Sequence, residues 1–167
     1  EKVNKIKKIL NHRGPDYSDH INKKNAIFIH NRLSIIDLVK RSNQPFESKD
    51  KSKILVFNGE IYNFVEIKKE LKKYNYKFRT NSDTEVLLTA YEKWGIDCVN
   101  RLEGMFAFAI YDLKKKKAFF ARDRFGQKPI FFWKKEKKIY FSSEIKGLIA
   151  AGYNPKPNLR VWFDYLY

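Results

Sequence analysis

The second half of the chain narrows the choice of fold most, because short apolar stretches alternate there with short polar turns. Apolar and aromatic residues dominate positions 105–111, 117–122, 129–133 and 138–141, and mostly lysine-rich or glycine-containing turns separate them. Stretches of this length joined by such turns are typical of consecutive antiparallel strands. The pattern predicts an antiparallel meander.

The first half predicts helices as well as strands. Apolar residues recur at helical spacing between positions 3 and 10, and strands are expected over residues 26–30 and 54–57. Residues 33–38 form a further apolar segment. Asn58-Gly59 is the dipeptide that most favours a hairpin turn, so the strand before it is expected to end there.

Two later segments have the sequence pattern of helix N-termini. Asn63 with Glu66, and Ser82 with Glu85, have the spacing of a capping box, in which side chains satisfy the free N–H groups of the first turn. Together the elements predict an α+β protein with largely antiparallel sheets covered by helices.

The end of the chain differs from the rest. Pro155 and Pro157 predict a stiff connector, and Asn158 is placed to cap an apolar helix through Leu166. We therefore expect one domain over residues 1–152, and over residues 153–167 a linker and the start of a further domain.

The composition excludes several classes of protein. The formal net charge is +16, but the lysines are spread over predicted helix faces and turns, so no specific nucleic-acid partner is predicted. No apolar run is long enough to cross a membrane. A single cysteine, Cys98, rules out an internal disulfide, and no signal-peptide pattern opens the chain. Cytoplasmic localisation is the expectation.

Three polar segments are candidates for chemistry, and each has a structural alternative. Arg32 is either a surface or salt-bridge residue or a fork for a carboxylate. Asn58 and Gly59 are either a tight turn or two donors for an oxyanion, with the Glu60 carboxylate beside them. Asp83 is either an acid favoured by the dipole at a helix start or the partner of a ligand ammonium.

Other catalytic patterns are missing. The sequence has no glycine-rich phosphate loop, no nucleophile elbow and no metal-ligand spacing among His12, His20 and His30. Cys98 lies between apolar neighbours just after a predicted helix end, so we interpret it as a packing residue and not as a nucleophile.

Taken together, the short strings resemble one family, the glutamine-hydrolysing asparagine synthetases. The resemblance is to their glutaminase domain and extends from about residue 12 to residue 152. It rests on the order and spacing of residues 12–16, 32–37, 44–45, 58–63, 82–85, 104–109, 121–126 and 142–146.

The resemblance implies an N-terminal-nucleophile hydrolase fold, a four-layer αββα sandwich with two antiparallel sheets. It also implies class II glutamine amidotransferase chemistry for asparagine biosynthesis. In that family the mature chain begins with a cysteine, whose thiol attacks the glutamine amide while its own α-amino group handles the proton. A glutamyl-enzyme forms, ammonia leaves, and water releases glutamate.

The resemblance also assigns residues to a glutamine pocket. Arg32 would bind the α-carboxylate, and the adjoining wall would comprise Leu33, Ser34, Ile35 and Ile36. Glu60 and Asp83 would hold the α-ammonium group, and Asn58 with the Gly59 N–H would form the oxyanion hole. No metal and no cofactor is expected in this domain.

The sequence departs from the family pattern at its start, because residue 1 is Glu1 and the cysteine nucleophile is missing. We therefore predict that this chain does not itself hydrolyse glutamine. The synthetase domain, which would bind ATP and Mg²⁺, adenylate the acceptor carboxylate and receive ammonia, is also missing. Glutamine and that domain are the expected partners, and a homodimer is a further option.

The sequence leaves other functions open. An asparagine-synthetase-like amidotransferase of another pathway, such as cell-envelope polysaccharide modification, would share this domain. A glutamine-binding or regulatory module without catalytic activity would also fit the missing cysteine. A polyanion-binding protein is the last alternative, motivated by the charge alone.

Overall fold

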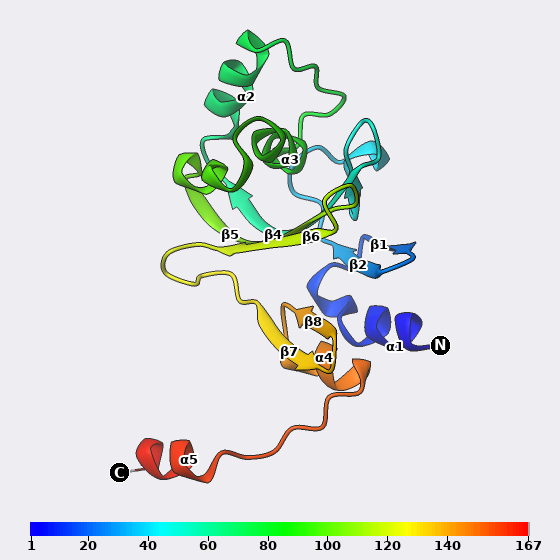
Figure 1. Ribbon diagram of the computed structural model, residues 1–167, viewed down its shortest axis with the longest axis vertical. Helices are drawn as coiled ribbons and strands as arrows, with labels where there is room; N and C mark the ends of the chain where they lie inside the picture. The colour runs from blue at the N-terminus through cyan, green and yellow to red at the C-terminus, as the bar shows by residue number, and fades with distance from the viewer. Residues whose placement is uncertain (167) are drawn as a thin grey trace.

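The computed structural model describes residues 1–166 as four layers in the order helix, sheet, sheet, helix (Figure 1). The elements in chain order are α1 (Lys2–Ile9), η1 (Asn11–Arg13), β1 (Tyr17–Lys23), β2 (Ala26–Arg32), η2 (Lys40–Ser42), β3 (Phe46–Glu47), β4 (Lys53–Ile61), α2 (Phe64–Lys73), α3 (Asp83–Trp94), η3 (Gly95–Arg101), β5 (Gly104–Asp112), β6 (Lys117–Arg122), β7 (Phe131–Lys135), β8 (Lys138–Ser142), α4 (Ile145–Ala151) and α5 (Leu159–Leu166).

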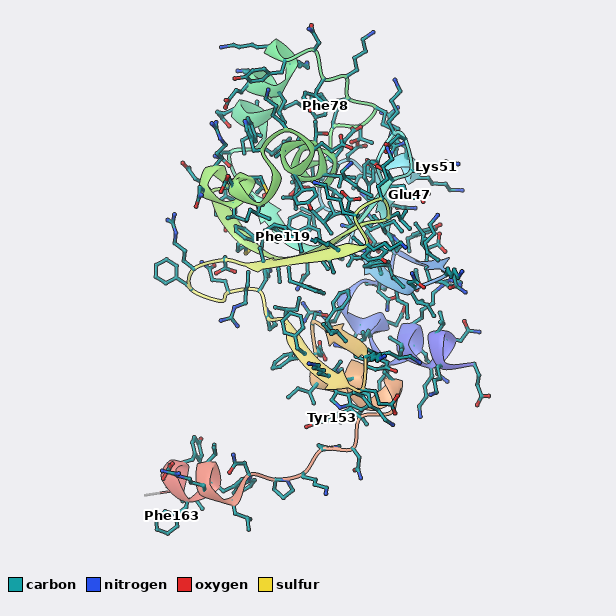
Figure 2. The ribbon with its side chains drawn as sticks, in the orientation of Figure 1. Glu47, Lys51, Phe78, Phe119, Tyr153 and Phe163 are labelled. Atoms are coloured by element: carbon teal, nitrogen blue, oxygen red, sulfur yellow. The ribbon has the colours of Figure 1, made fainter. Side chains whose placement is uncertain are left out.

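The central layer is a four-stranded antiparallel sheet in the order β3-β4-β5-β6. Its longest ladder joins β4 to β5, from Lys53 opposite Asp112 to Ile61 opposite Gly104. The face toward α2 and α3 is covered by the larger apolar core. Phe78, in the segment between α2 and α3, and Phe119 of β6 also pack against this core (Figure 2). The buried members of that core are Phe46, Leu55, Phe57, Ile61, Ile67, Leu71, Val86, Leu87, Leu88, Ala90, Cys98, Leu102, Phe106, Phe108 and Ile110.

The opposite face of this sheet meets two hairpins, β1-β2 and β7-β8. Phe28 of β2 is buried in one cluster with Ile54 and Val56 of β4. Phe141 of β8 packs at the same cluster and meets Phe120 of β6 edge to face, with ring centroids 5.1 Å apart. Helices α1 and α4 lie together beyond the hairpins and form the fourth layer (Figure 1).

The predicted α+β sandwich with an αββα order is confirmed, and the predicted meander is only partly correct. Strands β5-β6 and β7-β8 pair as expected, but β6 and β7 belong to different layers. The Asp123 carboxylate explains the break, because it accepts hydrogen bonds from the backbone N–H groups of Phe106, Phe125, Gln127 and Lys128. These bonds fold the segment after β6 into a loop that leads to the second layer, where the hairpins are two separate sheets.

The predicted hairpin turn at Asn58-Gly59 is wrong, because β4 continues through both residues to Ile61. Gly59 has φ 151°, and a Cβ atom there would lie 2.1 Å from the Met105 carbonyl oxygen. Gly104, on the neighbouring strand, has φ 154°, and its Cβ would lie 2.1 Å from the Glu60 carbonyl oxygen. The glycines therefore permit a close approach of two backbones inside a ladder.

Of the two predicted capping boxes, the first does not form and the second forms only in part. Asn63 precedes α2 but makes no capping bond, because its amide donates to the Arg101 carbonyl and accepts from the Glu103 N–H. Ser82 does cap α3 by accepting from the Thr84 N–H at 3.1 Å. The Glu85 carboxylate does not complete a box with Ser82.

Glu85 instead binds the turn that leads into α3, which explains why the second box is only half correct. Its carboxylate accepts hydrogen bonds from the backbone N–H and hydroxyl of Thr80, each at 2.7 Å, and from the Arg79 N–H. The acid therefore fixes the approach to the helix and leaves the capping of its first turn to Ser82.

The apolar segment after Arg32 is an irregular loop and not a strand, and Leu33, Ile35 and Leu38 are exposed on it. The chain past Tyr153 extends away from the layers to α5, which carries Phe163 (Figures 1 and 2). Asn158 caps α5 as predicted, by accepting from the Arg160 N–H at 3.2 Å. In residues 1–166 no helix is long and apolar enough to span a membrane.

The glycine at the end of β5 yields the first prediction. Gly104→Ala should lower the free energy of unfolding by about 2–4 kcal/mol, because the new methyl group collides with backbone that the ladder holds in place. The control is Gly95→Ala, where φ is 62° but no atom lies within 4 Å of the added Cβ, so a loss of only about 1 kcal/mol is expected. Chemical denaturation measures both, and equal losses would contradict the close-approach explanation.

Candidate functional site

Strand β4 carries Asn58, Gly59 and Glu60, and Asp83 binds to its outer edge, on the side away from β5. The Phe57 N–H donates to Gln44 Oε1 at 2.7 Å, and the Ile61 N–H donates to Asp83 Oδ2 at 3.1 Å. Alternate residues of a strand direct their N–H groups to the same edge, so the Gly59 N–H lies on this edge between those two bonds. No described side chain or loop accepts a hydrogen bond from it. Gly59 therefore presents a backbone donor on an open edge.

The side-chain amide of Asn58 is a second unused donor at this point of the strand. Its Nδ2 atom is buried and, in the described part of the chain, has no hydrogen-bond partner. Leaving such a group unpaired costs about 1–3 kcal/mol, which is why buried polar groups are normally satisfied. An unpaired amide next to an open N–H is suited to a ligand oxygen, such as a carbonyl or an oxyanion.

Asp83 supplies negative charge next to these donors. It is the first residue of α3 and only 5% exposed. A second acid, Glu60 of β4, acts on it electrostatically. Burial raises the pKa of the Asp83 carboxyl, and the Glu60 carboxylate raises it further, while N–H groups of Ile61 and Thr84 act in the opposite direction. Two carboxylates at one end of a site are suited to a ligand cation.

Arg32 ends β2 and is buried, with 6% of its surface exposed. Its two terminal nitrogens donate to the carbonyls of Ile36, Asp37 and Val39 and to Asn43 Oδ1, at 3.1, 2.5, 3.3 and 2.6 Å. The guanidinium therefore folds the following loop around itself. These four bonds use both terminal nitrogens, and none of them uses the Nε–H.

The loop from Leu33 to Ile36 is tied to the region of Asp83 by its next residue. The Asn81 N–H, two residues before Asp83, donates to Asp37 Oδ2 at 2.6 Å. This and other hydrogen bonds outweigh the effect of burial and hold the pKa of Asp37 below its usual range. At the other side, the Ser34 N–H donates to Asp16 Oδ2 at 2.7 Å. The predicted wall residues thus form a loop anchored at both ends, with Leu33 and Ile35 exposed.

Sequence reasoning missed the residues that connect these parts. Gln44 is 7% exposed and joins Phe57 to Thr84, and His30 Nε2 also reaches the Phe57 carbonyl, at 3.2 Å. Burial lowers the pKa of His30 to about 4, so the ring is neutral at neutral pH. Gln44 and Asp37 belong to strings that carried the family resemblance, but their spacing gave no sign of a connecting role.

Cys98 is unsuited to be a nucleophile for this site. It is fully buried in the core under α3, and burial, together with the Asp97 carboxylate, raises the pKa of its thiol to about 12. A thiol that is protonated and inaccessible is inert. Within residues 1–166 no cluster of three or more His, Cys, Asp or Glu side chains could hold a metal ion.

Two surface hollows lie elsewhere and do not include the candidate residues. One of about 390 Å³ opens between β3 and α3, with Phe46, Arg79 and Glu92 on its wall, and the other follows the surface of α2. The β4 edge is singled out by its chemistry and not by its depth, because it combines the unpaired Asn58 amide with a buried acid, Asp83, bound to Ile61.

The fold and this arrangement define a protein class. Residues 1–166 match the family described as the glutamine amidotransferase domain, and the chain belongs to that family. Its fold is similar to that of a glutamine phosphoribosylpyrophosphate amidotransferase from B. subtilis, with a TM-score of 0.63 and 24% identity, over 74% of this chain and 29% of that chain. This supports the predicted N-terminal-nucleophile hydrolase fold.

Named relatives narrow the comparison. The chain is 39% identical over 151 residues to "Asparagine synthetase [glutamine-hydrolyzing] 1" of Bacillus subtilis (strain 168), covering 90% of this chain and 24% of that protein. It is 38% identical over 152 residues to "Asparagine synthetase B [glutamine-hydrolyzing]" of Escherichia coli (strain K12), covering 90% and 27%. The chain therefore spans about a quarter of the length of these relatives.

The buried acid yields a prediction about stability. Because the pKa of Asp83 is raised, the folded state favours the neutral carboxyl, so this residue lowers stability as pH rises through that pKa. Asp83→Asn should stabilise the chain at pH 7 by about 1 kcal/mol, or roughly 2–4 °C in Tm.

The same substitution gives a pH test of the explanation. The gain from Asp83→Asn should disappear at pH 3, where the native carboxyl is itself protonated. Asp164→Asn, on the exposed surface of α5, is the control and should change the stability neither at pH 7 nor at pH 3. A loss of stability at pH 7 in the Asp83 variant would refute the assignment of a destabilising charge.

Proposed function

We propose that this chain is the glutaminase domain of an asparagine synthetase and binds glutamine at the outer edge of β4. The observation that carries the proposal is the pair of free donors there, the buried Asn58 amide and the Gly59 N–H. Both are proposed to bind the oxygen of the glutamine side-chain amide, on which negative charge develops during hydrolysis. Loss of one such donor raises the barrier by about 3–4 kcal/mol in comparable sites.

The charges around the donors match the other end of the ligand. An amino acid carries an ammonium and a carboxylate on the same carbon, so a site for it needs anions and a cation close together. Glu60 and Asp83 are the anions and are proposed to hold the ammonium group. Arg32 is proposed to attract the carboxylate through its charge and its Nε–H, while its other donors hold the loop from Leu33 to Ile36 as the wall.

Hydrolysis needs a nucleophile besides this pocket. Cys98 does not serve, because it is buried and its pKa is about 12. In the proposed mechanism the pocket residues bind and orient glutamine and stabilise the oxyanion. The attacking thiol is supplied by a residue that is not among residues 1–167. We therefore expect this chain to bind glutamine without releasing glutamate.

The remainder of the proposed activity lies outside the pocket. We propose that residues 1–152 form the glutaminase domain, that residues 153–167 lead to a synthetase domain, and that ammonia passes to that domain for the ATP-dependent amidation of aspartate. ATP and Mg²⁺ are proposed to bind to that domain. The names of the relatives support this proposal, and an acceptor in another pathway is the alternative that shares the same pocket.

Calorimetry with L-glutamine tests the proposed pocket. The unsubstituted chain should bind glutamine saturably, Asn58→Ala should weaken binding by roughly tenfold, and Asp83→Asn by roughly tenfold to a hundredfold, because the bond to an ion is stronger. Asp164→Asn should bind as the unsubstituted chain does. Weaker binding by the Asp83 variant together with its higher Tm would separate a ligand contact from damage to the fold.

Two outcomes would contradict the proposal. Absence of any glutamine binding by the unsubstituted chain would remove glutamine as its ligand. Glutamate release by the same chain, measured by an enzyme-coupled assay, would show that a nucleophile within residues 1–167 had been overlooked. Loss of release in Cys98→Ala would then identify that nucleophile.

A further inference from the structure

Gln44 occupies the position of a missing strand on the outer edge of β4. Strand β3 pairs with β4 only at Phe46 opposite Leu55 and Glu47 opposite Ile54. Beyond that point the Gln44 side chain takes over, accepting from the Phe57 N–H at 2.7 Å and donating to the Phe57 carbonyl at 3.2 Å. These are the two bonds that a residue of a neighbouring strand would make.

The same side chain also touches the helix that carries the acid. Gln44 Nε2 lies 3.4 Å from Thr84 Oγ1, in the first turn of α3 directly after Asp83. One buried amide therefore connects the residue before Asn58 with the residue after Asp83. The preceding residue, Asn43, accepts from Arg32 at 2.6 Å, so the same segment also contacts the guanidinium.

We propose that Gln44 is a positioning residue that fixes the Asn58 and Gly59 donors relative to Asp83. The proposal rests on the proposed function for the meaning of that geometry. A side chain does here what a longer β3 could not do: a further strand residue would pair with Gly59 and consume its N–H. Gln44 satisfies Phe57 and ends the pairing there, which leaves the next outward N–H free for a ligand.

The Gln44 side-chain amide is held in one orientation by its burial and its hydrogen bonds. Both ends of the Gln44 side chain are hydrogen-bonded, and His30 Nε2 meets the same Phe57 carbonyl from β2. Movement of Gln44 therefore changes the position of Phe57, and Asn58 follows in the next peptide unit. Satisfied buried networks of this kind favour one geometry over alternatives.

The first test compares Gln44→Met with Gln127→Met, since methionine has a similar length but cannot make either bond. Gln127 is exposed in the loop before β7 and serves as the matched control. Two quantities are measured on the whole chain: its affinity for L-glutamine, and the ¹H–¹⁵N signals of the Asn58 side-chain amide and of the Gly59 and Thr84 backbones.

For Gln44→Met we expect glutamine binding to weaken roughly tenfold or more, and the three signals to shift while those of the β7-β8 hairpin stay in place. Gln127→Met should leave both quantities unchanged. A folded Gln44→Met chain with unmoved Asn58 and Gly59 signals and unchanged glutamine affinity would overturn the proposal. A merely structural role would spread the shifts over the whole sheet, and that pattern would also count against it.

If Gln44→Met does not fold, a second pair of variants tests whether Gln44 positions Asn58 and Gly59. Thr84→Val removes the hydroxyl that Gln44 approaches, whereas Thr84→Ser keeps it. Shifts of the Asn58 and Gly59 signals in the valine variant and not in the serine variant would support the proposal, and shifts in neither would contradict it. If the unsubstituted chain fails to bind glutamine, the proposed function falls, and the signal shifts alone decide whether Gln44 positions these groups.

Discussion

The pairing of β4 with β5 is the interaction on which the other parts of the structure depend. It runs without interruption from Lys53 to Ile61, and residues on both of its faces are buried, in one cluster under α3 and another under the hairpins. Gly59 and Gly104 allow the two backbones to meet at the end of the ladder, where any Cβ would strike a carbonyl. This ladder therefore fixes the positions of Asn58, Gly59 and Glu60, and Asp83 is hydrogen-bonded to the same strand at Ile61.

The site arises because the outer edge of that strand is satisfied by side chains instead of a strand. Gln44 takes the bonds of Phe57, Asp83 takes the N–H of Ile61, and the Gly59 N–H between them is left open. An exposed strand edge is ordinarily a liability, because it can pair with other chains. Here the open length is a single residue, flanked by a buried amide and a buried acid, and this short opening supports the proposal of a small ligand.

The resemblance and the periodicity together predicted the layers and the main strands. Local patterns failed where distant contacts decide the outcome. Asn58-Gly59 has the composition of a turn, yet the glycine is needed for contact with Met105, which lies far along the chain. The role of Gln44 depends on Phe57 and Thr84, and no periodicity marks it. The break after β6 follows from four bonds to Asp123, which a strand pattern does not reveal.

The central claim is that glutamine binds at the open edge of β4, and an NMR titration tests it most directly. Uniformly ¹⁵N-labelled chain would be titrated with L-glutamine, with each amide followed individually. The account predicts saturable shifts that begin at the Asn58 side-chain amide and the Gly59 N–H and include Asp83 at the start of α3. Shifts confined to the hollow between β3 and α3, or none at any concentration, would contradict it.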